Sequence, residues 1–191
     1  MAQQLNNYMI KKLIKSRRAI FPAQYNQKPI SKGDILEVLD AANWAPTHKK
    51  TEPWRFKVLQ GEKLVELGVF LSEKYKETTD KFSEFQYNKL RENPTKAACI
   101  IAICMQRDPA ESLPEWEEIA AVAMAVQNMW LLCTEKNIGA YWSSPGLIKF
   151  MGDFFNLKEG EKCLGFFYMG YYDEPSPVGV RRPIEDKVEW L

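Results

Sequence analysis

The sequence has little of the chemistry on which many enzyme sites are built. Its 191 residues include one histidine, His48, and four cysteines, none of which form a Cys-x-x-Cys pair. Zinc sites need clustered cysteine and histidine ligands, so no metal site is expected. A Ser-His-Asp or Cys-His site would have to use His48, yet no strand-turn-helix nucleophile elbow is present. A simple hydrolase is therefore not expected.

Two further absences limit the partners. Lys and Arg number 26 and Asp and Glu 25, and this balance gives no indication of a nucleic-acid partner. The longest apolar run, residues 97–104, is far shorter than the ~20 residues of a membrane-spanning helix, so no membrane is expected. The first residues lack the apolar core of a signal peptide. Because the cysteines lie in apolar segments, as buried free thiols do, the expected location is cytoplasmic.

The familiar nucleotide-binding loops are also missing, since no Gly-x-Gly-x-x-Gly follows a strand and no Walker loop occurs. A hydrophobic content of 46% in 191 residues suits a single domain over residues 1–191. Hydrophobic periodicity predicts about five helices and three or four strands. Because these elements do not alternate strictly, the predicted class is α+β rather than a doubly wound sheet.

The predicted elements follow from apolar spacing and turn residues. The segment 62–93 is charged, and we expect its helix to break in the middle and to cover the core or a pocket. Residues 119–133 are apolar on nearly all sides, which predicts a helix buried on nearly all sides. Helices are predicted over 6–20, 31–45, 62–93, 114–137 and 147–155, and strands over 54–61, 96–106, 138–146 and 162–172.

Four segments in a fixed order carry a family resemblance and together span nearly the whole chain. They are SRRAIF from residue 16, WAPTHKKTEPWRF from 44, AAVAMAVQNMWLLCTEKNIGAYWSS from 120 and GYYDEPSPVGVRRPIEDKVEW from 170. The set resembles the nitroreductase family of FMN-dependent oxidoreductases, and its second segment is most similar to a small branch of that family. The resemblance implies a mostly antiparallel central sheet flanked by helices, with a C-terminal extension that reaches the partner subunit.

The resemblance also implies a homodimer with FMN in two sites at the subunit interface, each built from both chains. It implies that two electrons pass from NADH or NADPH to the flavin and then to a nitroaromatic, quinone or similar acceptor in a ping-pong scheme. No catalytic protein residue is expected, because the cofactor carries the chemistry.

The FMN phosphate is a dianion and favours arginine or lysine. Arg17 and Arg18 lie near the end of the first predicted helix. The helix dipole favours cations at that end, so their position can also be explained without a ligand. The family pattern makes both of them candidates for the phosphate or the flavin edge. Ala19 replaces the family's serine, so the hydroxyl hydrogen bond to FMN is lost and only its backbone can contact the cofactor. Arg181 and Arg182 lie in a tail that ends in large apolar residues, and one of the two is expected to meet the phosphate.

The loop that holds His48 has two interpretations. The histidine either lies on a surface loop or donates a hydrogen bond to the phosphate or ribityl chain of an FMN held mainly by the other subunit, and we favour the second. Trp44 stands where relatives can carry arginine and could replace a phosphate contact with stacking. Lys50 could add positive charge near the isoalloxazine ring.

A third group of candidates follows the turn at Gly139. In the family, the segment of Trp142, Ser143 and Ser144 passes along the flavin with backbone groups near N5 and O4. Trp142 fits a core aromatic equally well. For the two serines the functional interpretation is stronger, because small polar residues allow close backbone approach.

Two other classes of function remain open. Ala19, Trp44 and Glu52 depart from the family pattern, which leaves room for a flavin-binding carrier or partner-controlled module with little turnover. The charged segment 73–93 could instead be the docking face of a small interaction module. NADH oxidation with an added acceptor separates the first alternative from an enzyme, and bound flavin excludes the second.

Overall fold

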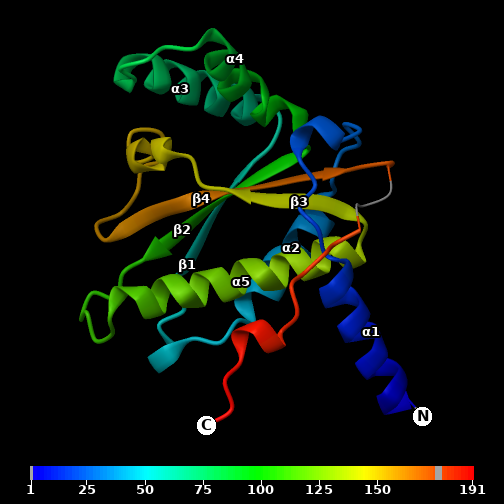
Figure 1. Ribbon diagram of the computed structural model, residues 1–191. Coiled ribbons are helices and arrows are strands. Elements are labelled where there is room, and N and C mark those ends of the chain that lie inside the picture. The colour runs from blue at the N-terminus through cyan, green and yellow to red at the C-terminus, as the bar shows by residue number, and fades with distance from the viewer. Residues whose placement is uncertain (1, 175–177) are drawn as a thin grey trace.

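The computed structural model describes residues 2–174 and 178–191 and has a layered α+β architecture (Figure 1). All strand pairs are antiparallel, and the strand order is β1-β2-β4-β3. The α+β class and the mostly antiparallel sheet are therefore confirmed. The strands are β1 (Trp54–Leu59), β2 (Cys99–Gln106), β3 (Ile138–Ser143) and β4 (Glu161–Tyr171), and the α-helices are α1 (Ala2–Ser16), α2 (Lys32–Asn43), α3 (Glu62–Thr78), α4 (Glu84–Glu92) and α5 (Glu115–Glu135).

The sheet separates two cores. Helices α2 and α5 cover one face, and α3 and α4 lie over the other (Figure 1). Strand β2 is buried on both faces because alternate side chains enter opposite cores. Ile101 and Ile103 pack toward α5, whereas Ile100 and Ala102 pack toward α3. Strand β3 lies at the edge of the sheet, and this edge matters for the site.

Serine caps explain where two of the helices begin. The Ser31 hydroxyl accepts a hydrogen bond from the Asp34 backbone N–H at 3.0 Å and starts α2. Ser83 accepts from the Gln86 N–H at 3.4 Å and starts α4. The break predicted within segment 62–93 is thus confirmed, because α3 ends at Thr78 before this second cap. The predicted helix over 147–155 is wrong, since the chain forms a 3-10 helix over Gly146–Phe150 there.

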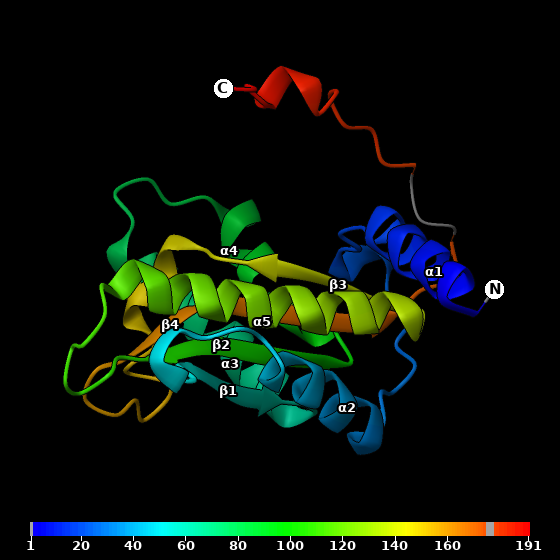
Figure 2. The same ribbon diagram turned by 90° about the horizontal axis from the view of Figure 1, so that it is seen from below.

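Helix α5 differs from its prediction. Ile119 and Met124 are 39% and 40% exposed, so burial on nearly all sides is wrong for the single protomer. The exposed positions Trp116, Ile119, Ala123, Met124 and Gln127 recur every three or four residues and form one face. Figure 2 looks onto this side of the molecule, with α5 lying across the sheet beside α2. No helix in the described ranges is long and apolar enough to span a bilayer.

Helix α4 packs closely against α3 at Gly68. A Cβ atom at this position would lie 2.2 Å from the carbonyl oxygen of Arg91. Gly68→Ala is therefore expected to push the two helices apart and to lower the free energy of unfolding by about 1–3 kcal/mol. Urea denaturation measures the change. Gly152→Ala is the matched control, because nothing lies within 4 Å of its added Cβ. Equal midpoints for the two variants would contradict this account of the α3–α4 contact.

The C-terminal tail, residues 178–191, extends away from the body beyond the end of α1 (Figure 2). Its large apolar side chains find little cover within the protomer. Trp190 is 93% exposed, and Val178, Val180 and Ile184 are exposed as well. The tail therefore presents an apolar surface that the described part of this chain leaves uncovered.

Candidate functional site

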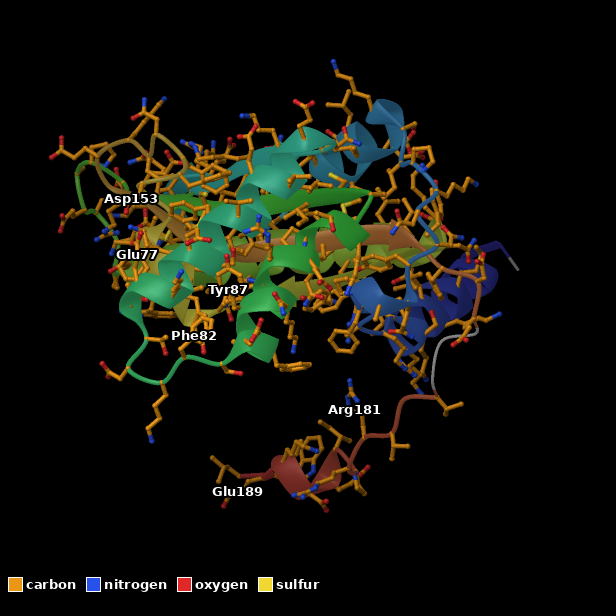
Figure 3. The ribbon with its side chains drawn as sticks, turned by 90° about the horizontal axis from the view of Figure 1, so that it is seen from above. Glu77, Phe82, Tyr87, Asp153, Arg181 and Glu189 are labelled. Carbon is orange, nitrogen blue, oxygen red and sulfur yellow. The ribbon has the colours of Figure 1, made fainter. Side chains whose placement is uncertain are left out.

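Three arginines gather where the tail passes the end of α1. The Arg17 guanidinium lies 4.4 Å from the centroid of the Trp130 ring. Arg18 packs against the tail so closely that a Cβ atom at Gly179 would lie 2.2 Å from its guanidinium carbon. Burial lowers the pKa of Arg17, and the nearby charges of Arg181 and Arg18 lower it further. The side chain of Arg181 points from the tail back toward the body (Figure 3).

This arginine cluster, Arg17, Arg18 and Arg181, concentrates positive charge. Within the described ranges, no ion pair joins Arg17 or Arg181 to a carboxylate. Neighbouring like charges are stabilised by a multivalent anion, and a phosphate offers several acceptors to forked donors. Arg181 and Arg182 are both exposed, but of the two only Arg181 contributes to the lowered pKa of Arg17. The geometry therefore favours Arg181 over Arg182.

The predicted segment of β3 runs beside the arginine cluster. The Ile20 N–H donates to the Ala140 carbonyl at 3.1 Å, which holds Ala19 against the edge strand. The Trp142 indole N–H donates to the Leu164 carbonyl at 3.3 Å, and the ring packs on the core beneath α5. Trp142 thus packs as a core aromatic, which is one of the two interpretations that the sequence left open. Ser143 is half-buried and Ser144 is exposed, so the chain opens to solvent at the end of β3.

A cavity of about 430 Å³ opens beside this strand end. Aromatic rings form one wall, since the centroids of Phe21 and Tyr141 lie 5.0 Å apart and those of Tyr141 and Tyr168 also 5.0 Å. Burial raises the pKa of both tyrosines, which keeps them neutral. Polar lining groups come from Ser143 and from three residues at or just after α4 that the sequence did not single out, namely Gln86, Lys89 and Asn93.

The loop that carries His48 lies over the start of α5. His48 Nδ1 is 2.6 Å from the Glu117 carboxylate, and the imidazole remains 59% exposed. Lys49 and Lys50 have positive φ values of 50° and 56°, and Glu52 has 43°. Three non-glycine residues in the left-handed region store strain, which is typical of functional segments. Lys49 Nζ holds the loop down by donating to the Ser112 carbonyl at 3.0 Å.

Within one protomer, this loop and the arginine cluster lie apart. Glu117 near the start of α5 and Trp130 near its end are separated by about 20 Å of helix, at ~1.5 Å per residue. The structure therefore brings the arginine cluster and Ala19 together with the β3 segment, but leaves Trp44, His48 and Lys50 elsewhere. Trp44, the C-cap of α2, is 80% exposed.

The segment that follows Arg17 and Arg18 thus joins β3, and Phe21 and Tyr141 there line the aromatic-walled cavity. Comparison with known proteins identifies the family of this chain. The profile of the nitroreductase family matches residues 14–171, and the chain belongs to this family. This match confirms the resemblance to the nitroreductase family that the four sequence segments indicate. It also confirms that the protein is an oxidoreductase enzyme.

Individual relatives agree with this assignment. The chain is 32% identical over 187 residues to YfhC of Bacillus subtilis, which is named as a candidate NAD(P)H nitroreductase, with 94% of this chain and 92% of YfhC covered. A nitroreductase-like protein from Bacillus cereus has a similar structure, with a TM-score of 0.80, 28% identity and 95% of each chain covered. A nitroreductase with bound FMN from Bacteroides fragilis shares the fold, with a TM-score of 0.71, 20% identity and coverage of 95% and 98%.

Proposed function

We propose that this protein, acting as one domain over residues 1–191 in the cytoplasm, is an FMN-dependent oxidoreductase. NADH or NADPH supplies two electrons, and a nitroaromatic, quinone or similar acceptor receives them in a ping-pong scheme. The observation that carries the proposal is the arginine cluster at β3 beside the aromatic-walled cavity. This pairing fits FMN because the cofactor joins a dianionic phosphate to a planar ring system. When bound, the flavin supplies the electron transfer.

The residues of this chain bind and orient the cofactor. Arg17, Arg18 and Arg181 hold the phosphate through charge-assisted hydrogen bonds. Ala19 offers backbone contact next to them. The backbone at Ser143 and the exposed Ser144 borders the ring, because β3 ends there beside the cavity. Trp142 supports this strand end from the core rather than stacking on the ligand.

We also propose a homodimer in which α5 helices pair across a twofold axis. The exposed face of α5 is apolar at Ile119, Ala123 and Met124, which matches the self-complementary patch of an isologous interface. Met124 lies near the middle of the helix, so an antiparallel pair sets the start of one α5 beside the end of the other. The partner's loop would then lie beside this chain's arginine cluster, with His48, Lys50 and Trp44 completing the site.

The glutamate partner of His48 limits what the imidazole does there. Because Glu117 accepts from Nδ1, the ring is held in one orientation with Nε2 free to face a ligand. A protonated ring donates from Nε2 to the phosphate or ribityl chain. The tail is proposed to pack on the partner, where Val180, Ile184 and Trp190 lose their exposure.

A visible spectrum followed by stepwise reduction tests the function. The purified protein is expected to show the absorbance of oxidised flavin, and NADH or NADPH added without oxygen should bleach it. After the nucleotide is removed, addition of the acceptor should restore the absorbance. Recovery without donor supports the ping-pong scheme. Bound flavin that neither nucleotide reduces would favour the alternative of a carrier with little turnover. The observation behind this alternative is Ala19, which lacks the hydroxyl of the family's serine. A colourless protein that binds no added FMN would refute both.

A further inference from the structure

The cavity beside β3 carries a single full charge. Among the described residues that line it, Lys89 is the one side chain charged at neutral pH, since the two tyrosines remain neutral. The other lining residues are uncharged: they are apolar or aromatic, or carry an amide or a hydroxyl group. An amphipathic cavity with one positive group complements a planar molecule with one negative group.

Lys89 is not used for structural pairing. The ion pairs of the described residues include its helix neighbours, with Arg91 at 3.8 Å from Glu73 and Glu92 at 3.7 Å from Lys96, but not Lys89. Lys89 is exposed and lines the cavity, so its ammonium group can pair with an anion there with the modest strength of a solvent-accessible ion pair. This side chain is therefore available to a ligand.

The spacing along α4 turns the polar groups toward one side. Gln86, Lys89 and Asn93 follow one another at intervals of three and four residues, which places them on one helical face. They line the cavity together with the aromatic wall of Phe21 and Tyr141. A ring that packs on these aromatics has its substituents within reach of α4.

We propose that the flavin ring lies along the end of β3, that the part of this cavity facing α4 is the acceptor compartment, and that Lys89 selects aromatic acceptors bearing a carboxylate. This inference rests on the proposed function, because the acceptor must lie next to the flavin. The carboxylate pairs with Lys89 Nζ, and the amides of Gln86 and Asn93 meet the remaining polar groups. The ring of the acceptor lies against Phe21 and Tyr141, in the offset or tilted geometry that aromatic pairs prefer.

The test compares 4-nitrobenzoate with its uncharged analogue 4-nitrobenzamide, using the flavin-loaded protein. The wild type is expected to have a lower KM for the carboxylate, and Lys89→Met is expected to raise that KM by about threefold to fivefold at similar kcat. The KM for the amide should stay unchanged. Lys89→Arg keeps the charge and should retain the preference. Lys76→Met, an exposed lysine on α3 outside the cavity, is the matched control.

Binding of the non-reducible anion benzoate, followed by calorimetry, gives a readout without turnover. Affinity for benzoate should fall in Lys89→Met and persist in Lys89→Arg. Two outcomes would overturn the inference with the proposed function intact: a wild type that treats the two nitro compounds alike, or a Lys89→Met variant that loses FMN. The second outcome would assign Lys89 to the flavin itself. A wild type that binds no FMN would instead refute the proposed function, and the acceptor assignment with it.

Discussion

Protein in which Arg17 and Arg181 are both alanine is expected to purify without flavin and to bind added FMN at least about a hundredfold more weakly than the wild type. Each guanidinium removed deletes charge-assisted hydrogen bonds worth roughly 1.5–3 kcal/mol, and both losses fall on one phosphate. Fluorescence titration with FMN measures the change. The fold should persist, because Arg17 is only half-buried and Arg181 is exposed.

Arg182→Ala is the matched control for this prediction. It removes the same charge from the neighbouring position of the tail, where the side chain is exposed and does not contribute to the lowered pKa of Arg17. FMN affinity should stay close to that of the wild type. Loss of flavin in Arg182→Ala, with retention in the Arg17→Ala/Arg181→Ala protein, would reverse the assignment of the two tail arginines.

Mixed dimers show which chain supplies each group. His48→Ala homodimers should also retain FMN poorly, because each site lacks the imidazole. Exchange of subunits with the Arg17→Ala/Arg181→Ala protein should restore one complete site per mixed dimer if His48 acts across the interface. Should His48 and the arginines serve one site within the same chain, both sites of the mixed dimer would stay defective and no flavin binding would return.

Met124→Glu is expected to convert a dimer into monomers. The change places a carboxylate in the centre of the apolar face of α5, where burial without a partner costs several kcal/mol. A loss of ~4 kcal/mol weakens dimerisation about a thousandfold. Sedimentation velocity measures the state of the protein. FMN retention should fall with it, because the partner's loop no longer completes the site.

The control for this substitution is Val65→Glu. Val65 is an exposed apolar residue on α3, on the opposite side of the sheet, and is 52% exposed. It receives the same new charge without touching the proposed interface, so its sedimentation should match the wild type. An unchanged sedimentation profile for Met124→Glu would mean that the exposed face of α5 is not where two copies meet.

Local signals in the sequence were enough to predict most of the fold. The Ser31 cap, the alternation of β1 and the continuous apolar run of β2 each reflect interactions within a few residues. The failure over 147–155 has the same origin. This segment has helix-like apolar residues, but it is held by bonds such as Met151 N–H to Ile148 carbonyl at 3.1 Å, which close 3-10 turns instead.

The error at α5 has a different cause. Apolar residues on all sides of a helix predict that its surface is buried. They do not show whether the same chain or another molecule buries it. Met124 and Ile119 are as apolar as the buried Val122 and Val126, yet they face outward from the protomer. Only the position of α5 over the sheet shows which residues are left for another molecule.

The candidate site was predicted in part. Arginine pairs and a solitary histidine stand out in a sequence, whereas the polar residues of α4 resemble those of any exposed helix. Lys89 became a candidate only because α3 and α4 fold over the sheet and bring α4 to the cavity. Glu117 was missed for the same reason, since it lies 69 positions from His48. Such pairings depend on tertiary structure rather than on local spacing.

The four cysteines provide an experimental route to the tail. Cys99, Cys104, Cys133 and Cys163 are all buried, the most exposed at 8%. The native chain therefore offers a nearly silent background for thiol-directed probes. A nitroxide spin label attached to a single cysteine introduced at Val178 would then report from the tail alone. In an assembled pair, dipolar spectroscopy between the two labels would give the span from one tail to the other directly.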